Sequence, residues 1–257
     1  MSLSDQEDIS NEFSMTYSGG TLIMAGNTIG LPADIPKRSL ETLMAADLLV
    51  FEEDRGARQA LKAAGLHRPY LKFSEHHESA TLDAVRDALK AKKTVCYMSD
   101  QGMPTWADPG QDLLQIAYQL KARVQIIPGP NSIAAALAAC PFYFGRFYFA
   151  GFFERDPTLR RRQLDELKDL GVPLVIMDTP YRLHALVDDL ILTLGGKRQS
   201  FLALDISGPS EAYVPSSLEG LKARLASWKG KLNFVLVIEG GSQSTSRGAP
   251  AKRRDAR

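Results

Sequence analysis

Short apolar segments alternate with segments of helical periodicity along most of this 257-residue chain, and this alternation limits the fold more than any other feature. The apolar segments have the length of buried strands, and the segments between them carry apolar residues three and four positions apart. A strand–helix order repeated in this way predicts a mostly parallel sheet covered by helices, and therefore an α/β fold. The expected strands are residues 21–25, 47–52, 94–98, 124–127, 148–151, 174–177, 201–205 and 234–238, and the expected helices are residues 39–46, 55–64, 81–91, 111–120, 132–140, 159–170, 182–194 and 217–228.

The alternation forms two series, and no sequence repeat relates them. We therefore expect an N-terminal α/β domain at residues 21–141 and a C-terminal α/β domain at residues 142–241, each with a mostly parallel sheet. Residues 1–20 are polar and residues 242–257 are rich in Ser, Arg and Lys, so both ends are expected to be disordered. The basic cluster at residues 252–254 is more typical of a solvated tail than of a nucleic-acid contact.

Composition restricts the classes of function. The formal net charge is +1, so the molecule as a whole is not a strong polyanion binder, and any contact to nucleic acid must come from local basic patches. Cys96 and Cys140 lie in apolar surroundings, which favours small core residues in a reducing compartment over a disulfide or a metal site. No apolar run approaches the roughly 20 residues of a membrane span, and no secretory signal is evident. We expect a soluble, cytoplasmic protein.

Four loops that follow expected strands are rich in Gly, Pro and small polar residues. Glycines let a ligand approach the backbone and prolines fix the turn. Ligands of open α/β folds sit beyond the carboxyl ends of strands, so the four loops together predict a shared cleft between the two domains. No Walker A or GxGxxG pattern is present, which excludes the standard mononucleotide and dinucleotide sites. The loops are GNTIG at 26–30, SDQGMPTWADPG at 99–110, PGPNS at 128–132 and DTPYR at 178–182.

These loops, with three further segments, resemble the tetrapyrrole methylase superfamily of S-adenosylmethionine-dependent methyltransferases. Within it, the chain is most similar to the 16S ribosomal RNA ribose 2′-O-methyltransferases, whose motifs are close to SDAGTP with SDPG, PGPS and ESPHR. The further segments are EEDRGAR at 52–58, SEHHE at 74–78, and AGFFERD at 150–156 with RRRQL at 160–164. They resemble AEDTRVTR, HEHNE, and EGFLPRK with RRRRL. The likeness covers about residues 21–240 in the same order.

The resemblance implies that S-adenosylmethionine is bound in the cleft between the two domains. It implies that Asp100 faces the amino group or sulfonium of the cofactor; the alternative is that Asp100 caps the turn that follows it. Asp108 is expected to cap the helix at residues 111–120. The implied cofactor-binding residues are Thr28, Ile29, Gly30, Ser99, Asp100, Gly102, Met103, Pro104, Pro128, Gly129, Pro130, Asn131, Ser132, Asp178, Thr179 and Pro180.

Methyl transfer to a ribose hydroxyl requires that the hydroxyl be positioned and deprotonated. The candidates for the base lie in the run at residues 75–78, of which we select Glu75, His76 and Glu78; His77 completes the run. The same run also suits a polar loop at the edge of a cleft. A metal site needs further ligands at defined spacing, which the pattern lacks, so we expect no metal.

Two groups of arginines are candidates for contacts to RNA phosphates, namely Arg55 with Arg58 and Arg160 with Arg161 and Arg162. Solvated helix faces, or ion pairs with Glu52 and Glu53 in the case of the first group, are the alternatives. Trp106 is expected to pack rather than to cover the cofactor.

The chain departs from the family pattern mainly on its RNA-binding side. Leu31, Asp54 and Met103 stand where Asn, Thr and Thr are expected. In the loop DISGPSEA at 205–212, where the family has ELTKLHEE, Gly208 replaces a Lys and Ser210 replaces a His. A lost lysine removes a phosphate contact.

Three functions therefore stay open. The first is methylation of a ribose in 16S rRNA, which we favour. The second is methylation of a tetrapyrrole or another small molecule, and the third is non-catalytic binding of S-adenosylmethionine or RNA. The family resemblance also implies a homodimer, which the small-residue helix at residues 132–140 would suit.

Overall fold

A computed structural model describes residues 16–74, 79–104 and 109–241. Contacts within the chain divide it into two compact units, Met1–Asn131 and Ser132–Arg257. The sequence placed the boundary ten residues later, after residue 141. The difference is helix α6 (Ser132–Ala139), which contacts strand β10 (Phe234–Ile238) of the second unit.

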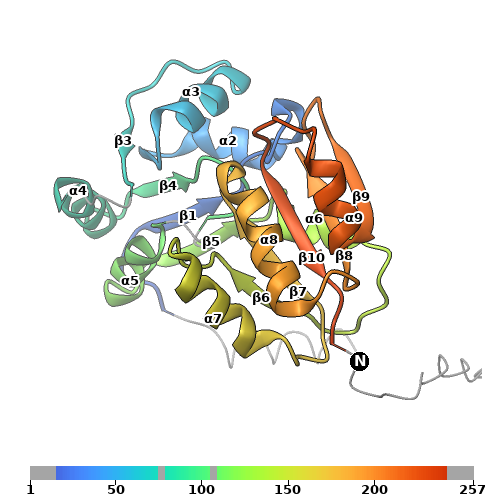
Figure 1. The fold of residues 1–257 in the computed structure, drawn as a ribbon. Coiled ribbons are helices and arrows are strands. Elements are labelled where there is room, and N and C mark those ends of the chain that lie inside the picture. Colours follow the sequence, from blue (N-terminus) through green and yellow to red (C-terminus); the bar gives the residue numbers. More distant parts are fainter. Residues whose placement is uncertain (1–15, 75–78, 105–108, 242–257) are drawn as a thin grey trace, which may run out of the picture. The chain divides into compact units, whose positions relative to one another are not determined.

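The first unit is built on a parallel sheet with the strand order β3-β2-β4-β1-β5 (Figure 1). This confirms the predicted pairing for the N-terminal half. Strand β1, which lies between β4 and β5, aligns Ile23 with Cys96 of β4 on one side and with Gln125 of β5 on the other. The strands are β1 (Thr21–Ala25), β2 (Leu48–Phe51), β3 (Leu71–Lys72), β4 (Thr94–Met98) and β5 (Arg123–Ile127), and the helices are η1 (Pro32–Asp34), α2 (Lys37–Ala45), α3 (Asp54–Ala63), α4 (Ser79–Lys90) and α5 (Gln111–Gln119).

Both faces of the first sheet are buried, as a continuous apolar strand pattern predicts. Alternate residues of β1, such as Leu22 and Met24, pack with Val85 of α4 and Leu113 of α5. The residues between them pack on the opposite face against α2 and α3. The helices therefore cover both faces and leave the strand ends to the loops.

The second unit contains a mixed sheet with the order β6-β7-β10-β8-β9. Only β6 and β7 are parallel; the other three pairings are antiparallel, so the expectation of a mostly parallel second sheet is wrong. The strands are β6 (Tyr148–Gly151), β7 (Leu174–Asp178), β8 (Gln199–Leu204), β9 (Ala212–Ser217) and β10, and the helices after α6 are α7 (Pro157–Leu167), η2 (Pro180–Arg182), α8 (Leu183–Leu194) and α9 (Leu218–Leu225).

Strand β9, which we did not predict from the sequence, accounts for part of this difference. Its sequence AYVPSS contains Pro215 and alternates between exposed and partly buried residues, as befits an edge strand. A short loop returns the chain from β8 directly into β9, which makes this pair antiparallel. Strand β10 then inserts between β7 and β8 and is antiparallel to both.

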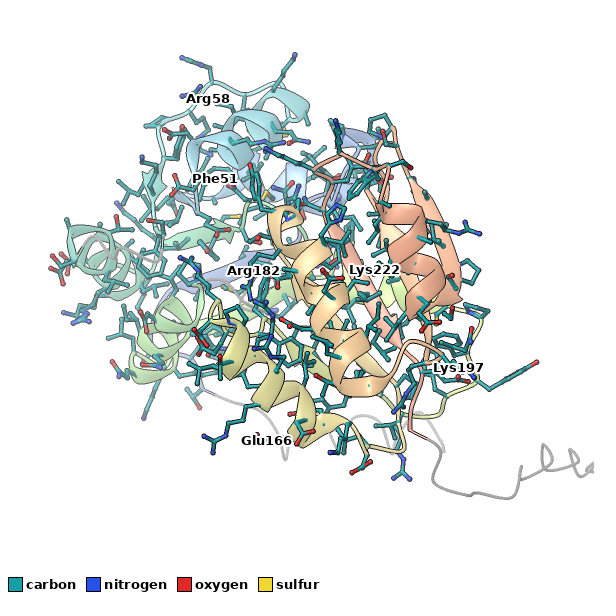
Figure 2. All side chains as sticks on the ribbon, in the orientation of Figure 1. Phe51, Arg58, Glu166, Arg182, Lys197 and Lys222 are labelled. Carbon is teal, nitrogen blue, oxygen red and sulfur yellow. The ribbon has the colours of Figure 1, made fainter. Side chains whose placement is uncertain are left out.

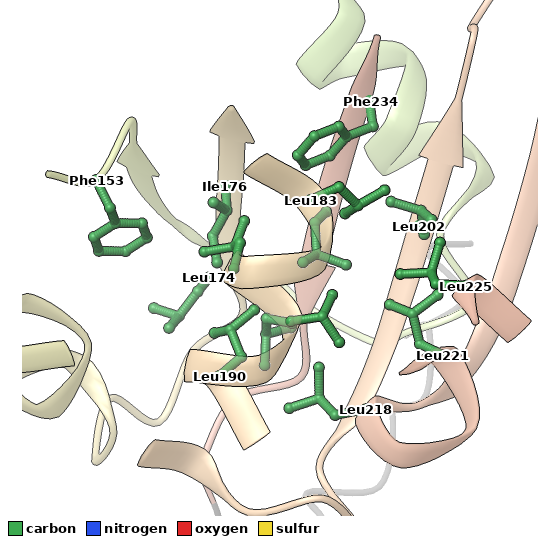
Figure 3. Close-up of a cluster of buried hydrophobic side chains, with 14 of the residues drawn as sticks. Phe153, Leu174, Ile176, Leu183, Leu190, Leu202, Leu218, Leu221, Leu225 and Phe234 are labelled. Carbon is green, nitrogen blue, oxygen red and sulfur yellow. The ribbon is translucent and has the colours of Figure 1, made fainter. Parts of the chain in front are cut away.

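Leucines from three helices fill one face of the second sheet (Figure 3). Leu183 and Leu190 of α8, with Leu221 of α9, pack against alternate strand residues such as Ile176 and Leu202. All are 0–1% exposed. This core holds α8, and with it the turn that precedes α8, firmly against the sheet.

The predicted ends of the chain fall mostly outside the described residues. Residues 1–15 and 242–257 are among those not described. Residues 16–20 were also expected to be disordered, but Gly20 is buried and its N–H donates to the carbonyl of Leu89 at 2.7 Å. In the part of the chain that the structure describes, no helix is long and apolar enough to cross a membrane.

Candidate functional site

Parallel pairing brings the predicted cofactor loops of the first unit to one edge of its sheet. All five strands point the same way, so the loops after β1, β2, β4 and β5 leave the sheet together. Three of the loops carry predicted cofactor residues, at 28–30, 99–104 and 128–131. Ser132 begins α6 and belongs to the second unit.

Asn27 is the polar residue that fixes two of these loops against each other. Its side-chain Nδ2 donates to the carbonyls of Ser99 and Asp100 at 3.0 Å each, and its Oδ1 accepts from the Thr28 N–H at 2.8 Å. The Asn27 N–H donates to the carbonyl of Gly102 at 2.7 Å, and the Gly102 N–H returns a bond to Thr28 at 3.0 Å. Asn27 is completely buried. We did not select it from the sequence, although a polar residue directly after a buried strand is a usable signal.

Two glycines allow the loops after β1 and β5 to cross in direct contact. A Cβ atom on Gly26 would lie 2.7 Å from the Cα atom of Gly129, so neither position has room for a side chain. Gly102 in the β4 loop has φ +71°, in the left-handed region that favours glycine. The Met103 sulfur accepts from the Gly129 N–H at 3.1 Å. These contacts therefore bring the backbones of the three loops close together.

One oxygen of the Asp100 carboxylate binds the start of α3 and not the turn that follows Asp100. The Oδ1 atom accepts from the backbone N–H groups of Glu53 and Gly56, at 3.2 and 3.3 Å. These groups lie at the start of α3, where N–H groups lack partners within the helix. The Asp100 N–H in turn donates to Glu52 Oε2 at 2.9 Å. Asp100 thus caps α3 from another loop, and joins the segments EEDRGAR and SDQGMP into one structural unit.

Arg55 and Arg58 lie on the first turns of α3, and both are exposed (Arg58 is labelled in Figure 2). Arg58 faces Asp54 at 3.9 Å across an exposed ion pair. Asp54 also faces Lys72 at 3.7 Å and accepts from the hydroxyl of Tyr70 at 3.0 Å. Arg55 forms no ion pair with a described residue. Of the two arginines, Arg55 is therefore the more available to a substrate.

Asp178 ends strand β7 in the second unit, and its carboxylate is buried. Its Oδ1 atom accepts from the Thr179 N–H at 2.6 Å and lies 3.3 Å from Arg182 Nη1. Its Oδ2 atom is buried and has no hydrogen-bond partner among the described residues. Burial raises the pKa of Asp178 above its ordinary value, against the opposing effects of the Thr179 N–H and of the charges on Arg182 and Arg160.

Arg160 is a structural residue, and the expectation that it binds phosphate is wrong. Arg160 is 4% exposed, and its Nε and Nη2 atoms both contact Oδ2 of Asp189 on α8, with an Nε–Oδ2 distance of 2.7 Å. A buried, paired arginine cannot turn to a ligand without leaving Asp189 as an unpaired buried charge.

Its two neighbours are also paired. Arg161 Nη1 lies 3.1 Å from the other Asp189 oxygen, and Arg162 faces Glu166 at 3.6 Å on the helix surface. Arg161 and Arg162 are partly or largely exposed, so they keep some capacity for a phosphate, whereas Arg160 does not.

The loop between β8 and β9 is a compact acidic turn. Asp205 and Ser207 have φ values of +46° and +63°. Asp205 Oδ2 accepts from the Ser210 N–H at 2.8 Å, and Glu211 Oε2 accepts from the Ser207 N–H at 2.6 Å. A Cβ atom on Gly208 would overlap the Asp205 carboxylate, so this backbone has no place for the lysine that the family pattern led us to expect.

The predicted base residues lie outside the described residues. Glu75, His76, His77 and Glu78 follow β3, whose carboxyl end is at the same sheet edge as the cofactor loops. Trp106 and Asp108 are also not described. Among the described residues, no group of three or more His, Cys, Asp or Glu side chains is arranged to hold a metal ion.

The fold is that of known methyltransferases. The solved cobalt precorrin-4 methyltransferase aligns with a TM-score of 0.64 at 15% identity, over 85% of this chain and 94% of that one. A Thermus thermophilus uroporphyrin-III C-methyltransferase, complexed with S-adenosylhomocysteine, aligns with a TM-score of 0.59 at 17% identity, over 86% and 97%. At these identities the likeness shows the fold alone.

Sequence comparison identifies the family. Residues 21–222 match the tetrapyrrole (corrin/porphyrin) methylases, and the chain belongs to this family. It is 34% identical over 188 residues to the ribosomal RNA small subunit methyltransferase I of Thermotoga maritima, covering 73% of this chain and 84% of the relative. It is 30% identical over 226 residues to the protein of the same name from Halalkalibacterium halodurans, covering 87% and 77%. The predicted resemblance is confirmed.

We expect Gly56→Ala to destabilise the protein, although Gly-to-Ala changes inside helices usually stabilise by about 0.5–1 kcal/mol. The new Cβ atom would lie 2.5 Å from Asp100 Oδ1 and 2.8 Å from its Cα atom, so the β4 loop must shift. The loss should be about 1–3 kcal/mol, measured by urea unfolding. Gly220→Ala in α9 is the control, because its Cβ atom meets only serine side chains. A Gly56→Ala protein as stable as the wild type would contradict this packing.

We expect Asp178→Asn to remove a pH dependence of stability. The folded state raises the pKa of Asp178, so it holds the proton more tightly than the unfolded state, whose value is about 3.9. The stabilisation is full below that value and is lost as the pH rises through the raised pKa. The unfolding free energy of the wild type minus that of Asp178→Asn should therefore fall from about pH 4 upward. Urea unfolding at a series of pH values measures it, and a difference that rises with pH would mean that the Arg182 charge outweighs burial.

Proposed function

We propose that this chain is a cytoplasmic S-adenosylmethionine-dependent methyltransferase that methylates a ribose 2′-hydroxyl of small-subunit ribosomal RNA. The observation that carries the proposal is its similarity to proteins named ribosomal RNA small subunit methyltransferase I, over 73–87% of the chain in the two relatives described above. The family match and the S-adenosylhomocysteine complex of a protein with the same fold support the choice of cofactor.

The chemistry of the candidate residues fits S-adenosylmethionine. The cofactor has an ammonium group, ribose hydroxyls and an adenine amine, all of which donate hydrogen bonds. The buried Oδ2 atom of Asp178 is an acceptor that lacks a donor among the described residues. In the first unit, the contact of Gly26 with Gly129 and the hydrogen bonds of Gly102 bring the backbones of the three loops close together.

The cofactor would supply a methyl group already activated on a sulfonium. In this proposal it is held by the loops at residues 28–30, 99–104 and 128–131 of the first unit, and by Ser132 and residues 178–180 of the second. Asp100 has a second role beside this one. Its Oδ1 atom accepts from N–H groups at the start of α3, and this contact positions the β4 loop.

The remaining task of the protein is to orient a ribose hydroxyl and to remove its proton. Glu75, His76 and Glu78 stay our candidates for the base, since they follow β3 at the edge where the cofactor loops gather. Arg55 is our first candidate for a phosphate contact, because Arg58 shares Asp54 and Arg160 is buried.

Methyl transfer tests the proposal directly. Small ribosomal subunits from a strain that lacks this gene should accept labelled methyl groups from S-adenosylmethionine, and subunits from the parent strain, already modified, should not. A 2′-O-methyl group blocks alkaline cleavage of the next phosphodiester, so the label should appear in an alkali-resistant dinucleotide. Label in single nucleotides would show base methylation. Tight binding of S-adenosylmethionine in calorimetry without label in RNA would favour another substrate or a non-catalytic role.

We also propose that the chain forms a homodimer. Only Ile133 and Ala136 of the apolar helix α6 are buried within the chain, and Tyr143, Tyr148 and Phe152 are exposed nearby in sequence. Apolar surface of this kind is typical of protein interfaces. Light scattering should give about twice the chain mass of 28.2 kDa. A mass equal to one chain at all concentrations would contradict the dimer.

A further inference from the structure

Two loops of the second unit meet at one end of its sheet, next to Asp178. Strands β7 and β10 are antiparallel, and their register pairs Asp178 with Phe234. Tyr181 comes three residues after Asp178, and Lys231 comes three residues before Phe234, so the pairing brings both to the same edge. The Nζ atom of Lys231 lies 4.7 Å from the centroid of the Tyr181 ring, a cation–π distance.

Side-chain contacts to neighbouring segments of the second unit hold both loops in place. Arg182, next to Tyr181, donates to the carbonyls of Phe153 and Glu154 at 2.9 and 2.6 Å and pairs with Asp178. In the other loop, the ring of Trp228 stacks on His184 of α8, with centroids 6.3 Å apart. The Tyr181 side is thus fixed by Arg182, which Figure 2 labels at the start of α8, and the Lys231 side by the Trp228–His184 stack.

The Tyr181 ring stays open to solvent on this rigid support. Tyr181 is 73% exposed, although it directly follows the proposed cofactor residues Thr179 and Pro180. Hydration of a large exposed aromatic ring is unfavourable, and the flat faces of the ring suit stacking against another ring.

The unpaired charge at this edge is positive. Lys229 and Lys231 are exposed, and neither forms an ion pair with a described carboxylate. The nearest acidic loop, at residues 205–211, uses the carboxylates of Asp205 and Glu211 to accept its own backbone N–H groups. The lysines therefore keep their charge available to an anion.

We propose that Tyr181 and Lys231 form an RNA-binding site, in which an unpaired base stacks on the Tyr181 ring and Lys231 neutralises an adjacent phosphate. An exposed ring beside a free cation is the combination that single-stranded RNA recognition uses. This inference rests on the proposed function and adds to it a contact outside the predicted arginines. It places phosphate binding in the loop after α9, at the same sheet edge as the β8–β9 loop in which Gly208 stands for the expected lysine.

The test compares Tyr181→Ala, Tyr181→Phe and Lys231→Gln in binding and methylation of small subunits from the deletion strain. Tyr181→Ala should weaken RNA binding roughly 5- to 100-fold, the loss of one base–aromatic stack, and raise KM for the subunit accordingly. Tyr181→Phe keeps the ring and should retain most of the affinity. Lys231→Gln should lower the slope of log affinity against log salt by about 0.7–0.9, the loss of one phosphate contact.

Matched controls separate this site from a general effect of surface changes. Tyr118→Ala removes a tyrosine that is 64% exposed at the end of α5, and Lys197→Gln removes an exposed lysine before the amino end of β8 (labelled in Figure 2). Both controls should bind RNA as the wild type does.

Unchanged RNA affinity in Tyr181→Ala and Lys231→Gln, with an active wild type, would overturn the site while leaving the proposed function intact. Weaker binding of S-adenosylmethionine with unchanged RNA binding would place the pair on the cofactor instead. A wild type that methylates no RNA would contradict the proposed function itself.

Discussion

The buried amide of Asn27 is the contact on which the first unit's candidate site depends. It joins the end of β1 to a loop 72 residues away, and both its donor and its acceptor atoms are used. A buried amide is stable only where all its partners are present, so it permits one arrangement of the two loops. Asp100 extends the arrangement by one step, because the same loop segment that Asn27 holds also caps α3. The Asn27 side chain, just after β1, thus helps to fix the position of α3 and of Arg55 on it.

In the second unit, ion pairs hold the loops in place, whereas in the first unit the amide of Asn27 does so. Arg182 and Arg160 both donate to backbone carbonyls of residues 153–155, and each is neutralised by its own carboxylate, Asp178 or Asp189. Pairing of this kind makes the burial of Arg160 and the partial burial of Arg182 tolerable. It also explains why a run of three arginines, which suggests RNA binding by composition, contributes little free charge. Only a residue's partners decide whether a cation serves the fold or a ligand.

These partners are what the sequence could not reveal. Periodicity located β1, β4, β6 and β10 at their observed bounds, because strand burial is a local pattern. It missed β9, whose Pro215 and half-exposed alternation resemble a loop. Likewise the glycine- and proline-rich loops of the first unit lie at one sheet edge, but the sequence did not predict the contact of Asp100 with α3. The N–H groups that donate to the Asp100 Oδ1 atom lie 44 and 47 residues away, at the start of α3, and no spacing rule links them. The pair Arg160–Asp189, 29 residues apart, is hidden for the same reason.

The acidic turn after β8 shows how such a contact limits the substitutions that a position accepts. Gly208 is packed against the Asp205 carboxylate, which in turn accepts from Ser210, so the three positions form one unit. A lysine at 208 would first have to displace that carboxylate, and the exposed Ser210 N–H would then exchange its acceptor for water. A lysine at this position therefore requires the turn to rearrange. The loop before β10 is its neighbour, because the Asp205 N–H donates to the Asn233 carbonyl at 2.8 Å. A cation on that loop needs no such rearrangement. For a chain that binds RNA at this edge, Lys231 therefore supplies positive charge without displacing the Asp205 carboxylate.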